Sequence, residues 1–403
     1  MISDKIQCCI VGAGPAGVLL SLLLARRGIH VHLLEMHQDL DRDFRGDTVH
    51  ASTLEALEQI ELADKVLEIP HAKMRSLSFV TPSQTTQVVQ FGRLKTRFPY
   101  VAMMPQAAFL ETLLDEARRY PNFQVSFNVT VTDLLEKKGK VVGVRTNSND
   151  RKAEITADLV VACDGRFSRL RNYNEPTVTP TSAPMDVAWI RLPRMASDPE
   201  NETGFHVADG KICVLLAREN EWQIGYVFPK GNFREMRSEG IEHFRSGLGQ
   251  IVPFLADRAS LLRDFSDIHM LNVRADFVET WHQQGLLLLG DAAHAMSPVG
   301  GVGINFAIAD AIEAANILSP VLASATLERS HLASIQRKRE KAVRKMQKLQ
   351  AVAQNHIVSK ALTNHEFQLP LIARLLLVLP FIRDIPAKIV AFGFDQPAID
   401  PDS

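Results

Sequence analysis

Cysteine is scarce in this chain of 403 residues, and the spacing of the few present excludes two kinds of site. The four cysteines form neither a CxxC redox pair nor a metal-ligand pattern, so we predict no metal site. Most of them lie in apolar runs typical of strands, where a thiol behaves as a small hydrophobic side chain. We therefore expect reduced core residues at Cys8, Cys9, Cys163 and Cys213.

An excess of charge of one sign is also missing. The 45 basic and 46 acidic side chains leave a net charge of −1, so we predict no nucleic-acid partner. Residues 1–7 lack the apolar middle and small-residue cleavage site of a signal peptide, which predicts a cytoplasmic protein. A hydrophobic content of 46% and a charged content of 23% are typical of a globular protein with no transmembrane segment.

The first 35 residues have the pattern of a βαβ unit. Residues 6–12 form an apolar run typical of a buried parallel strand, and residues 29–35 form a second one that ends on Glu35. Between them an apolar stripe predicts a helix that ends at Gly28. The turn that joins the first strand to this helix reads Gly12-Ala13-Gly14-Pro15-Ala16-Gly17, which is the GxGxxG pattern.

This turn has the residues that a bound pyrophosphate requires. Gly12 makes the tight turn, Gly14 lets a pyrophosphate approach the backbone, and Gly17 lets the helix pack on the strand. A carboxylate at Glu35 would accept hydrogen bonds from a ribose. We therefore predict a dinucleotide site, which on this unit alone fits both FAD and NAD. Because the sequence has one such fingerprint, we expect a second dinucleotide to bind only transiently.

Two later motifs decide between the cofactors. The first, within residues 158–171, contains Asp164-Gly165, and the second, within residues 285–305, contains Gly290-Asp291 and a glycine-rich turn before a predicted helix. At these motifs the chain resembles the para-hydroxybenzoate hydroxylase type of FAD-dependent monooxygenase (class A, single-component). The resemblance runs from residue 6 to about residue 318, with the motifs in the family's order.

The resemblance implies which residues contact FAD. Glu35 would hold the adenosine ribose, Arg45 would lie beside the pyrophosphate or the flavin, and Gln106 would contact the FAD chain. Asp164-Gly165 resembles the motif that serves both FAD and NAD(P)H, and Asp291 resembles the acid that binds the ribityl chain. The full expected set is Gly12, Gly14, Pro15, Ala16, Gly17, Glu35, Arg45, Gln106, Asp164, Gly165, Asp291, Pro298, Gly303, Ile304 and Asn305.

The last members of this set also have a physical rationale. Pro298 and the backbone of residues 303–305 would lie against the isoalloxazine ring, where the positive end of a helix suits the negative charge of reduced flavin. Asp164 and Asp291 are also suited to capping a turn or a helix, a role that can coexist with ligand binding. His294 could act as an acid or base, or could only hydrogen-bond its own loop.

As an enzyme of this type, the protein would use NADPH or NADH to reduce FAD and would insert one oxygen atom of O2 into a small, aromatic substrate through a C4a-hydroperoxyflavin. A flavin-dependent reductase or halogenase on the same scaffold, or a non-catalytic flavin-binding module, are the alternatives. A halogenase of the tryptophan type would carry a Trp-x-Trp-x-Ile-Pro run, whereas residues 221–229 contain one tryptophan and lack that pattern.

We predict an α/β fold in which a Rossmann-like, glutathione-reductase-type FAD-binding domain carries an inserted antiparallel β-sheet substrate domain and C-terminal helices. The FAD-binding domain would comprise residues 1–74, 101–174 and 271–325. The substrate domain would comprise residues 75–100 and 175–270, followed by a helical segment over residues 326–403.

The inserted sheet is the expected substrate wall. Asp209-Gly210 predicts a hairpin, and the strand after it places alternate aromatic and apolar side chains from Trp222 to Phe228 on one face, which we expect to be core. Gln223 is on the other face, which is free to meet a ligand. The candidate catalytic or substrate-contacting groups are Arg45, His206, Gln223 and Pro298.

The C-terminal part holds two features without a fixed role. A helix predicted over residues 327–358 carries a basic run at 337–348, which we interpret as a solvated face, with NADPH docking or an acidic partner surface as alternatives. Residues 369–382 are apolar but too short to span a bilayer, which favours a buried helix or a contact in a homodimer over membrane attachment.

Overall fold

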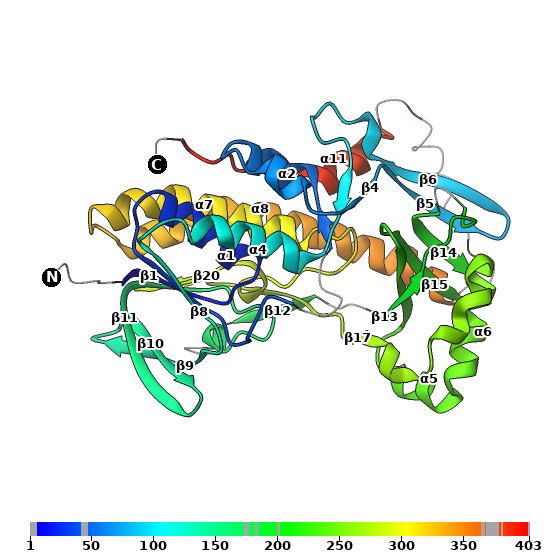
Figure 1. Ribbon diagram of the computed structural model, residues 1–403, viewed down its shortest axis with the longest axis horizontal. Coiled ribbons are helices and arrows are strands. Elements are labelled where there is room, and N and C mark those ends of the chain that lie inside the picture. Colours follow the sequence, from blue (N-terminus) through cyan, green and yellow to red (C-terminus); the bar gives the residue numbers. More distant parts are fainter. Residues whose placement is uncertain are drawn as a thin grey trace.

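Two large sheets and a pair of long, adjacent helices organise the molecule (Figure 1). The computed structural model describes residues 6–41, 47–172, 177–181, 184–199, 202–363, 367, 379 and 382–401. The expected contact Arg45, and all of residues 369–382 except Leu379 and Ile382, lie outside the described residues.

A sheet that is parallel from β20 to β8, and that we call the parallel sheet, forms around the N-terminal βαβ unit, with β19, β9 and β10 added antiparallel. Its strands lie in the order β19–β20–β11–β1–β2–β8, and the hairpin β9–β10 extends it through β11. The apolar run of β1 is buried on both faces: Cys8 and Ile10 pack with the helices on one side, and Cys9 and Val11 pack with β9, β10 and the helix α8 on the other. The strands are β1 (Ile6–Val11), β2 (Val31–Leu34), β8 (Phe123–Ser126), β9 (Thr130–Lys137), β10 (Lys140–Ser148), β11 (Arg151–Ala162), β19 (His282–Gln283) and β20 (Leu286–Leu288).

A seven-stranded sheet lies at the other end of the molecule (Figure 1). Its order is β17–β13–β16–β15–β14–β5–β6, antiparallel except where β14 pairs with β5. The hairpin predicted at Asp209-Gly210 joins β14 to β15, and both residues have the positive φ angles, 49° and 69°, of a tight hairpin turn. The strands are β5 (Ser76–Thr81), β6 (Gln84–Gln90), β13 (Met185–Pro193), β14 (Gly204–Ala208), β15 (Lys211–Ala217), β16 (Glu221–Pro229) and β17 (His269–Leu271).

The two faces of this sheet differ in what covers them. Trp222, Ile224, Tyr226 and Phe228 pack under α6 and the following 3₁₀ turn, which confirms that the aromatic face is core. We call it the helix-side face. Val187, Val207, Ile212 and Val227 form a cluster on the opposite face, against which Val299 from a distant loop packs. We call this one the loop-side face.

Smaller sheets and the helices complete the fold. Strands β3 (Thr48–Val49), β7 (Val101–Met103) and β4 (Ala72–Met74) form one small sheet, and β12 (Val178–Thr181) pairs with β18 (Ala275–Val278). The α-helices are α1 (Pro15–Arg26), α2 (Ala51–Glu58), α3 (Ala63–Leu67), α4 (Gln106–Ala117), α5 (Phe233–Glu239), α6 (Ile241–Ile251), α7 (Gly303–Ala323), α8 (Arg329–Ala353), α9 (Ser359–Thr363) and α11 (Ile385–Phe392). Short 3₁₀ turns are η1 (Phe91–Arg93), η2 (Leu170–Asn172), η3 (Pro253–Leu261), η4 (Phe265–Asp267) and η5 (Gly290–Ala292), and η6 (Gln354–Val358) is a π turn.

The long C-terminal helix differs from its prediction in two respects. It is α-helical only over α8 and then widens into the π turn η6 before α9, instead of continuing unbroken. The basic run is not entirely a solvated face, because Arg339 is buried, whereas Arg337, Lys341, Lys345 and Lys348 are exposed. Arg339 departs from the prediction because it forms a buried ion pair with Asp310 of α7.

The cysteines and the apolar helix α7 both agree with a globular core. All four cysteines are buried and free, as predicted. Among the described residues α7 is the one helix long and apolar enough to cross a membrane by length and composition, and 67% of its apolar window is buried inside the molecule. Core helices of globular proteins share this property.

Candidate functional site

Three loops that are far apart in the sequence meet at the carboxyl edge of the parallel sheet. The N–H of Cys163, after β11, donates to the carbonyl of Val11 in β1 at 2.7 Å, and the N–H of Leu289, after β20, donates to the carbonyl of Ala162 at 3.0 Å. A Cβ atom on Gly290 would lie 3.5 Å from the Cβ of Ala16 in α1. The three predicted motifs are therefore adjacent, at the edge where open α/β sheets bind their ligands.

The glycine loop has the geometry that its sequence predicts. Gly12 has a φ of +101°, and a Cβ there would lie 2.5 Å from the carbonyl oxygen of Cys163. A Cβ on Gly17 would lie 2.0 Å from the carbonyl oxygen of Gly12. At Gly14 no described atom lies within 4 Å of such a Cβ, so the backbone is open to an approaching group. No described side chain caps α1, which begins at Pro15, so its N–H groups are available to an anion.

Glu35 fastens this loop to the end of β2. Its Oε2 accepts a hydrogen bond from the N–H of Ala13 at 2.8 Å, and its Oε1 accepts one from the N–H of His37 at 3.0 Å. The carboxylate is thus buried beside the turn in which a dinucleotide ribose would lie.

Asp164 and Asp291 come from the two later motifs, and each has a structural partner. Asp164 accepts a hydrogen bond from the N–H of Arg169 at 3.1 Å, which is the turn-capping role. Burial raises the pKa of this carboxyl despite its hydrogen bonds. Asp291 forms an ion pair with Arg166 at 3.4 Å, which joins the motif at residues 285–305 to the motif at residues 158–171. Gly165, between them, has a φ of +78°, and no described atom lies within 4 Å of the position that a Cβ would take there.

The loop at residues 295–301 leads into α7. Thr48 Oγ1 donates to the carbonyl of Gly301 at 3.0 Å, which ties this loop to β3. No described side chain caps α7, so the N–H groups of Gly303, Ile304 and Asn305 in its first turn are free of intrahelical partners. The backbone that we expected beside a flavin therefore presents unpaired donors and the positive end of a 21-residue helix.

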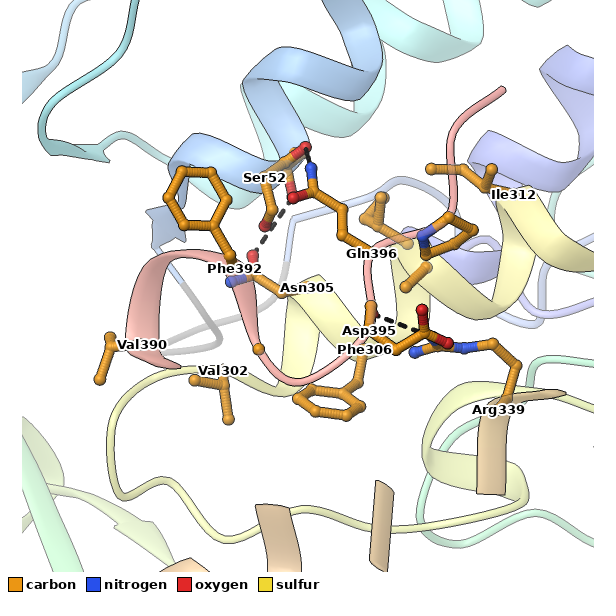
Figure 2. Close-up of a pocket in the computed structure, with 15 residues that line it drawn as sticks. Ser52, Val302, Asn305, Phe306, Ile312, Arg339, Val390, Phe392, Asp395 and Gln396 are labelled. Carbon is orange, nitrogen blue, oxygen red and sulfur yellow. Dashed lines mark hydrogen bonds and ion pairs between the residues drawn. The ribbon is translucent and has the colours of Figure 1, made fainter. Parts of the chain in front are cut away.

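The side chain of Asn305 points toward α2. Its Oδ1 accepts a hydrogen bond from Thr53 Oγ1 at 3.2 Å, toward α2 and the C-terminal segment (Figure 2). The start of α7, α2 and the C-terminal segment enclose a pocket with a cavity of about 20 Å³, which is room for about one water molecule. Gln396 closes it by donating to the carbonyl of Ser52 at 2.9 Å. This pocket is too small for a cofactor.

His294 is part of a buried ion-pair network rather than of an open site. Its Nε2 lies 2.6 Å from Asp310 Oδ2, and Arg339 Nε donates to Asp310 Oδ1 at 2.9 Å. The N–H of Gly290 also donates to Asp310, at 3.2 Å. Burial would raise the pKa of Asp310, but its interactions with His294 and Arg339 hold the pKa below the usual value. The bond from His294 therefore reaches α7 and not its own loop, as the second of the two roles considered for it would have required.

The two polar candidates on the seven-stranded sheet lie on opposite faces. His206 pairs with Cys213 on the helix-side face, is 3% exposed, and has its Nε2 at 2.8 Å from the carbonyl of Glu202. Burial lowers the pKa of this imidazole. Gln223 is on the loop-side face, opposite Leu216. The structure thus brings Gln223, and not His206, to the side on which Val299 packs.

A buried ion pair that we did not predict from the sequence joins the end of β15 in the seven-stranded sheet to the start of β3 in a small sheet. Arg218 contacts Asp47, and its Nη2 and Nε donate to Gln223 Oε1 at 2.9 and 3.2 Å. Asp47 in turn accepts a hydrogen bond from the N–H of Gln106, at the start of α4, at 3.3 Å. Burial lowers the pKa of Arg218. One feature of the sequence could have indicated this ion pair. Arg218 directly follows an apolar strand, and an arginine buried there needs a partner from another element to offset the loss of its hydration.

These features fit a bound FAD. The open approach at Gly14 and the uncapped start of α1 suit a pyrophosphate, which needs backbone N–H donors more than side-chain charge. The uncapped start of α7 suits the negative charge of a reduced flavin ring. Both donor sets come from loops that the sheet register places at one edge.

Comparison with known sequences agrees with this assignment. A family model described as FAD binding domain matches residues 5–350. The 6-methylpretetramide 4-monooxygenase of Streptomyces rimosus is 29% identical over 356 residues, which cover 87% of this chain and 84% of that protein.

Comparison with solved structures concerns the fold. The p-nitrophenol 4-monooxygenase PnpA of Pseudomonas putida DLL-E4 superposes with a TM-score of 0.78 at 20% identity, covering 97% of this chain and 99% of that one. The flavin-dependent brominase Bmp2 superposes with a TM-score of 0.74 at 14% identity, covering 99% and 95% of the two chains. The predicted α/β flavoprotein fold is confirmed, and monooxygenases and halogenases share it.

Proposed function

This chain belongs to the FAD binding domain family and is an FAD-dependent monooxygenase, and from that premise we propose that it inserts one oxygen atom of O2 into a small aromatic substrate, with NAD(P)H as the electron donor. The observation that carries the proposal is the convergence of three motif loops, with the uncapped starts of two helices, at one edge of the parallel sheet. A halogenase is the second candidate because a brominase shares the fold.

The redox and oxygen chemistry comes from FAD when it is bound. The protein binds FAD, orients the substrate beside it and keeps water out of the site. The N–H groups at the start of α1 would hold the pyrophosphate, Glu35 the ribose and Asp291 the ribityl chain, while Pro298 and the start of α7 would face the flavin ring. Asp164-Gly165 would serve FAD and the visiting NAD(P)H.

The loop-side face is the proposed substrate wall. It meets the 295–301 loop through Val299, and its aliphatic cluster suits an apolar aromatic ring. Gln223 and Arg218 are polar groups in the same region, and both are buried. A closed, largely apolar wall beside the flavin favours oxygen transfer to substrate over reaction with water.

Cofactor uptake, oxygen consumption and product mass together test the proposed function. Purified protein should take up FAD on titration, and O2 uptake coupled to NAD(P)H oxidation should rise when a phenol is added from a panel. With ¹⁸O2 the product should gain one heavy oxygen atom. A protein that takes up no FAD refutes the proposal, FAD uptake without stimulated O2 consumption indicates a binding module, and a brominated product formed in bromide buffer indicates a halogenase.

Gln223 and His206 form a matched pair for the substrate wall. We expect Gln223→Met to raise the KM for the aromatic substrate by about tenfold, with a smaller change in kcat. The substitution removes the hydrogen bonds that hold Arg218 beside the wall, and one hydrogen bond to a charged group is worth about 1.5 kcal/mol. We expect His206→Phe to leave KM unchanged, because His206 is on the helix-side face. Steady-state kinetics checks both. Equal effects of the two substitutions on KM would contradict the assignment of the faces.

A homodimer and a cytosolic location complete the proposal. Both are expected from the sequence alone. Size-exclusion chromatography with light scattering measures the first directly.

A further inference from the structure

A buried glutamine of α8 holds the 295–301 loop on both sides of Pro298. Gln350 Nε2 donates to the carbonyl of Ser297 at 2.9 Å and to the carbonyl of Val299 at 2.8 Å. Both partners are acceptors, so the amide nitrogen has to face the loop. Pro298 has no N–H, and its own carbonyl accepts a hydrogen bond from the N–H of Gly301 at 3.0 Å within the loop. The carbonyls of Ser297 and Val299 are therefore the groups by which α8 holds the loop on either side of Pro298.

Two more glutamines also donate hydrogen bonds to the 295–301 loop: Gln347 on the same face of α8, and Gln354 directly after the end of α8. Gln347 Nε2 donates to the carbonyl of Ala295 at 3.2 Å, and Gln354 Nε2 donates to Ser297 Oγ at 2.6 Å. Their spacing of three and four residues from Gln350 places the three amides in one row. The row meets alternate loop residues, 295, 297 and 299. We call Gln347, Gln350 and Gln354 the glutamine clamp.

Stability alone does not account for the clamp, because the clamp leaves polar atoms unpaired. Gln350 is 3% exposed and Gln354 is fully buried. The Oε1 atoms of both have no hydrogen-bond partner among the described residues. A buried amide oxygen without a partner is destabilising, whereas the apolar neighbours Val343 and Met346 fill comparable positions of the helix without that cost.

We propose that Gln350 is a positioning residue for the flavin, which sets the placement of Pro298 and of the start of α7 through the carbonyls of Ser297 and Val299. The inference rests on the proposed function, in which this loop faces the flavin ring. The N–H groups that begin α7 stabilise the charge of the reduced ring more than the neutral oxidised ring. A loop released from Gln350 should therefore weaken the binding of reduced flavin more than that of oxidised flavin.

The test compares Gln350→Met with Gln336→Met in the full-length protein. Methionine keeps the length and the apolar stem of glutamine and removes the donor. Gln336 is a matched control, because it is also buried on α8 and bonded to backbone, accepting from the N–H of Trp281 at 2.9 Å and donating to the carbonyl of Glu279 at 2.8 Å, away from the loop.

Two readouts are independent of turnover. In Gln350→Met, hydrogen exchange of a peptide covering residues 295–303 should become about tenfold faster without FAD, as expected for the loss of about 1.4 kcal/mol of protection. Oxidised FAD should bind as tightly as it does to wild type, while reduced FAD binds about tenfold more weakly, which lowers the two-electron midpoint potential by about 30 mV. Gln336→Met should change neither quantity.

The outcomes separate this inference from the proposed function. Unchanged exchange and midpoint potential in Gln350→Met, or equal changes in Gln336→Met, overturn the inference. A wild-type protein that binds no FAD refutes the proposed function, while the exchange measurement still tests the clamp. If Gln350→Met does not fold, Gln354→Met removes the single bond to Ser297 Oγ and should shift both readouts in the same direction by a smaller factor; no shift overturns the inference.

Discussion

Gly14→Asp is expected to abolish tight FAD binding while leaving the protein without cofactor as stable as wild type. Gly14 has an ordinary φ of −78°, and no described atom would contact a Cβ there. As the N-cap of α1, an aspartate should stabilise the helix by roughly a few tenths of a kcal/mol relative to glycine. The same carboxylate would occupy the N–H groups and repel a pyrophosphate, so affinity should fall by about 100-fold or more, which is about 2.7 kcal/mol.

Fluorescence titration with FAD and thermal unfolding of the apoprotein measure the two effects separately. Gly92→Asp is the matched control, because Gly92 also has no described atom within 4 Å of a Cβ and no positive φ. It should leave the FAD affinity unchanged. Wild-type affinity in Gly14→Asp would mean that the pyrophosphate does not bind at this loop.

Asp310→Ala should produce the largest loss of stability, about 3 to 5 kcal/mol in the free energy of unfolding. The substitution leaves Arg339, which is 1% exposed, without its buried partner. Because the pKa of Asp310 is held below its usual value, its contribution is present at neutral pH and is lost as the pH falls through that lowered pKa. The difference between wild type and variant should therefore shrink in acid.

Denaturant unfolding at saturating FAD, at neutral and at acidic pH, measures this difference. Arg337→Met is the control on the same helix, where an exposed arginine should change the free energy of unfolding by less than about 0.5 kcal/mol. The double variant Asp310→Leu with Arg339→Met should recover part of the loss, since it removes both charges. A loss below about 1 kcal/mol in Asp310→Ala would show that the pair is not a main support of the fold.

The fold was largely predictable because its signals are local. Residues 6–35 contain a buried strand, a glycine turn and an acid-terminated strand, and each of these depends on a few neighbouring residues. The Asp209-Gly210 hairpin and the face of Trp222 likewise follow from turn chemistry and from alternation. The division of the chain into domains at the stated boundaries stays a prediction.

The site was predictable only where a motif marks it. Asp164, Asp291 and the glycine turns are recognisable from their patterns, and the structure brings them together. Arg339 in the basic run was expected on a solvated face, and nothing in the sequence singled out Gln350. Their partners, Asp310 and the carbonyl of Ser297, are contributed by other elements. His206 and Gln223 could be separated only once the strand register was known.

The chain alternates between its two large sheets, so each sheet is assembled from strands that leave the ribosome at widely separated times. It places β1 and β2 in the parallel sheet, β5 and β6 in the seven-stranded one, returns with β8 to β11, leaves again with β13 to β17, and closes with β19 and β20. Neither sheet is complete until late in synthesis, so unpaired apolar edges stay exposed for much of translation. We therefore expect the protein to depend on chaperones during expression, and we expect fragments that contain only one of the two sheets not to fold.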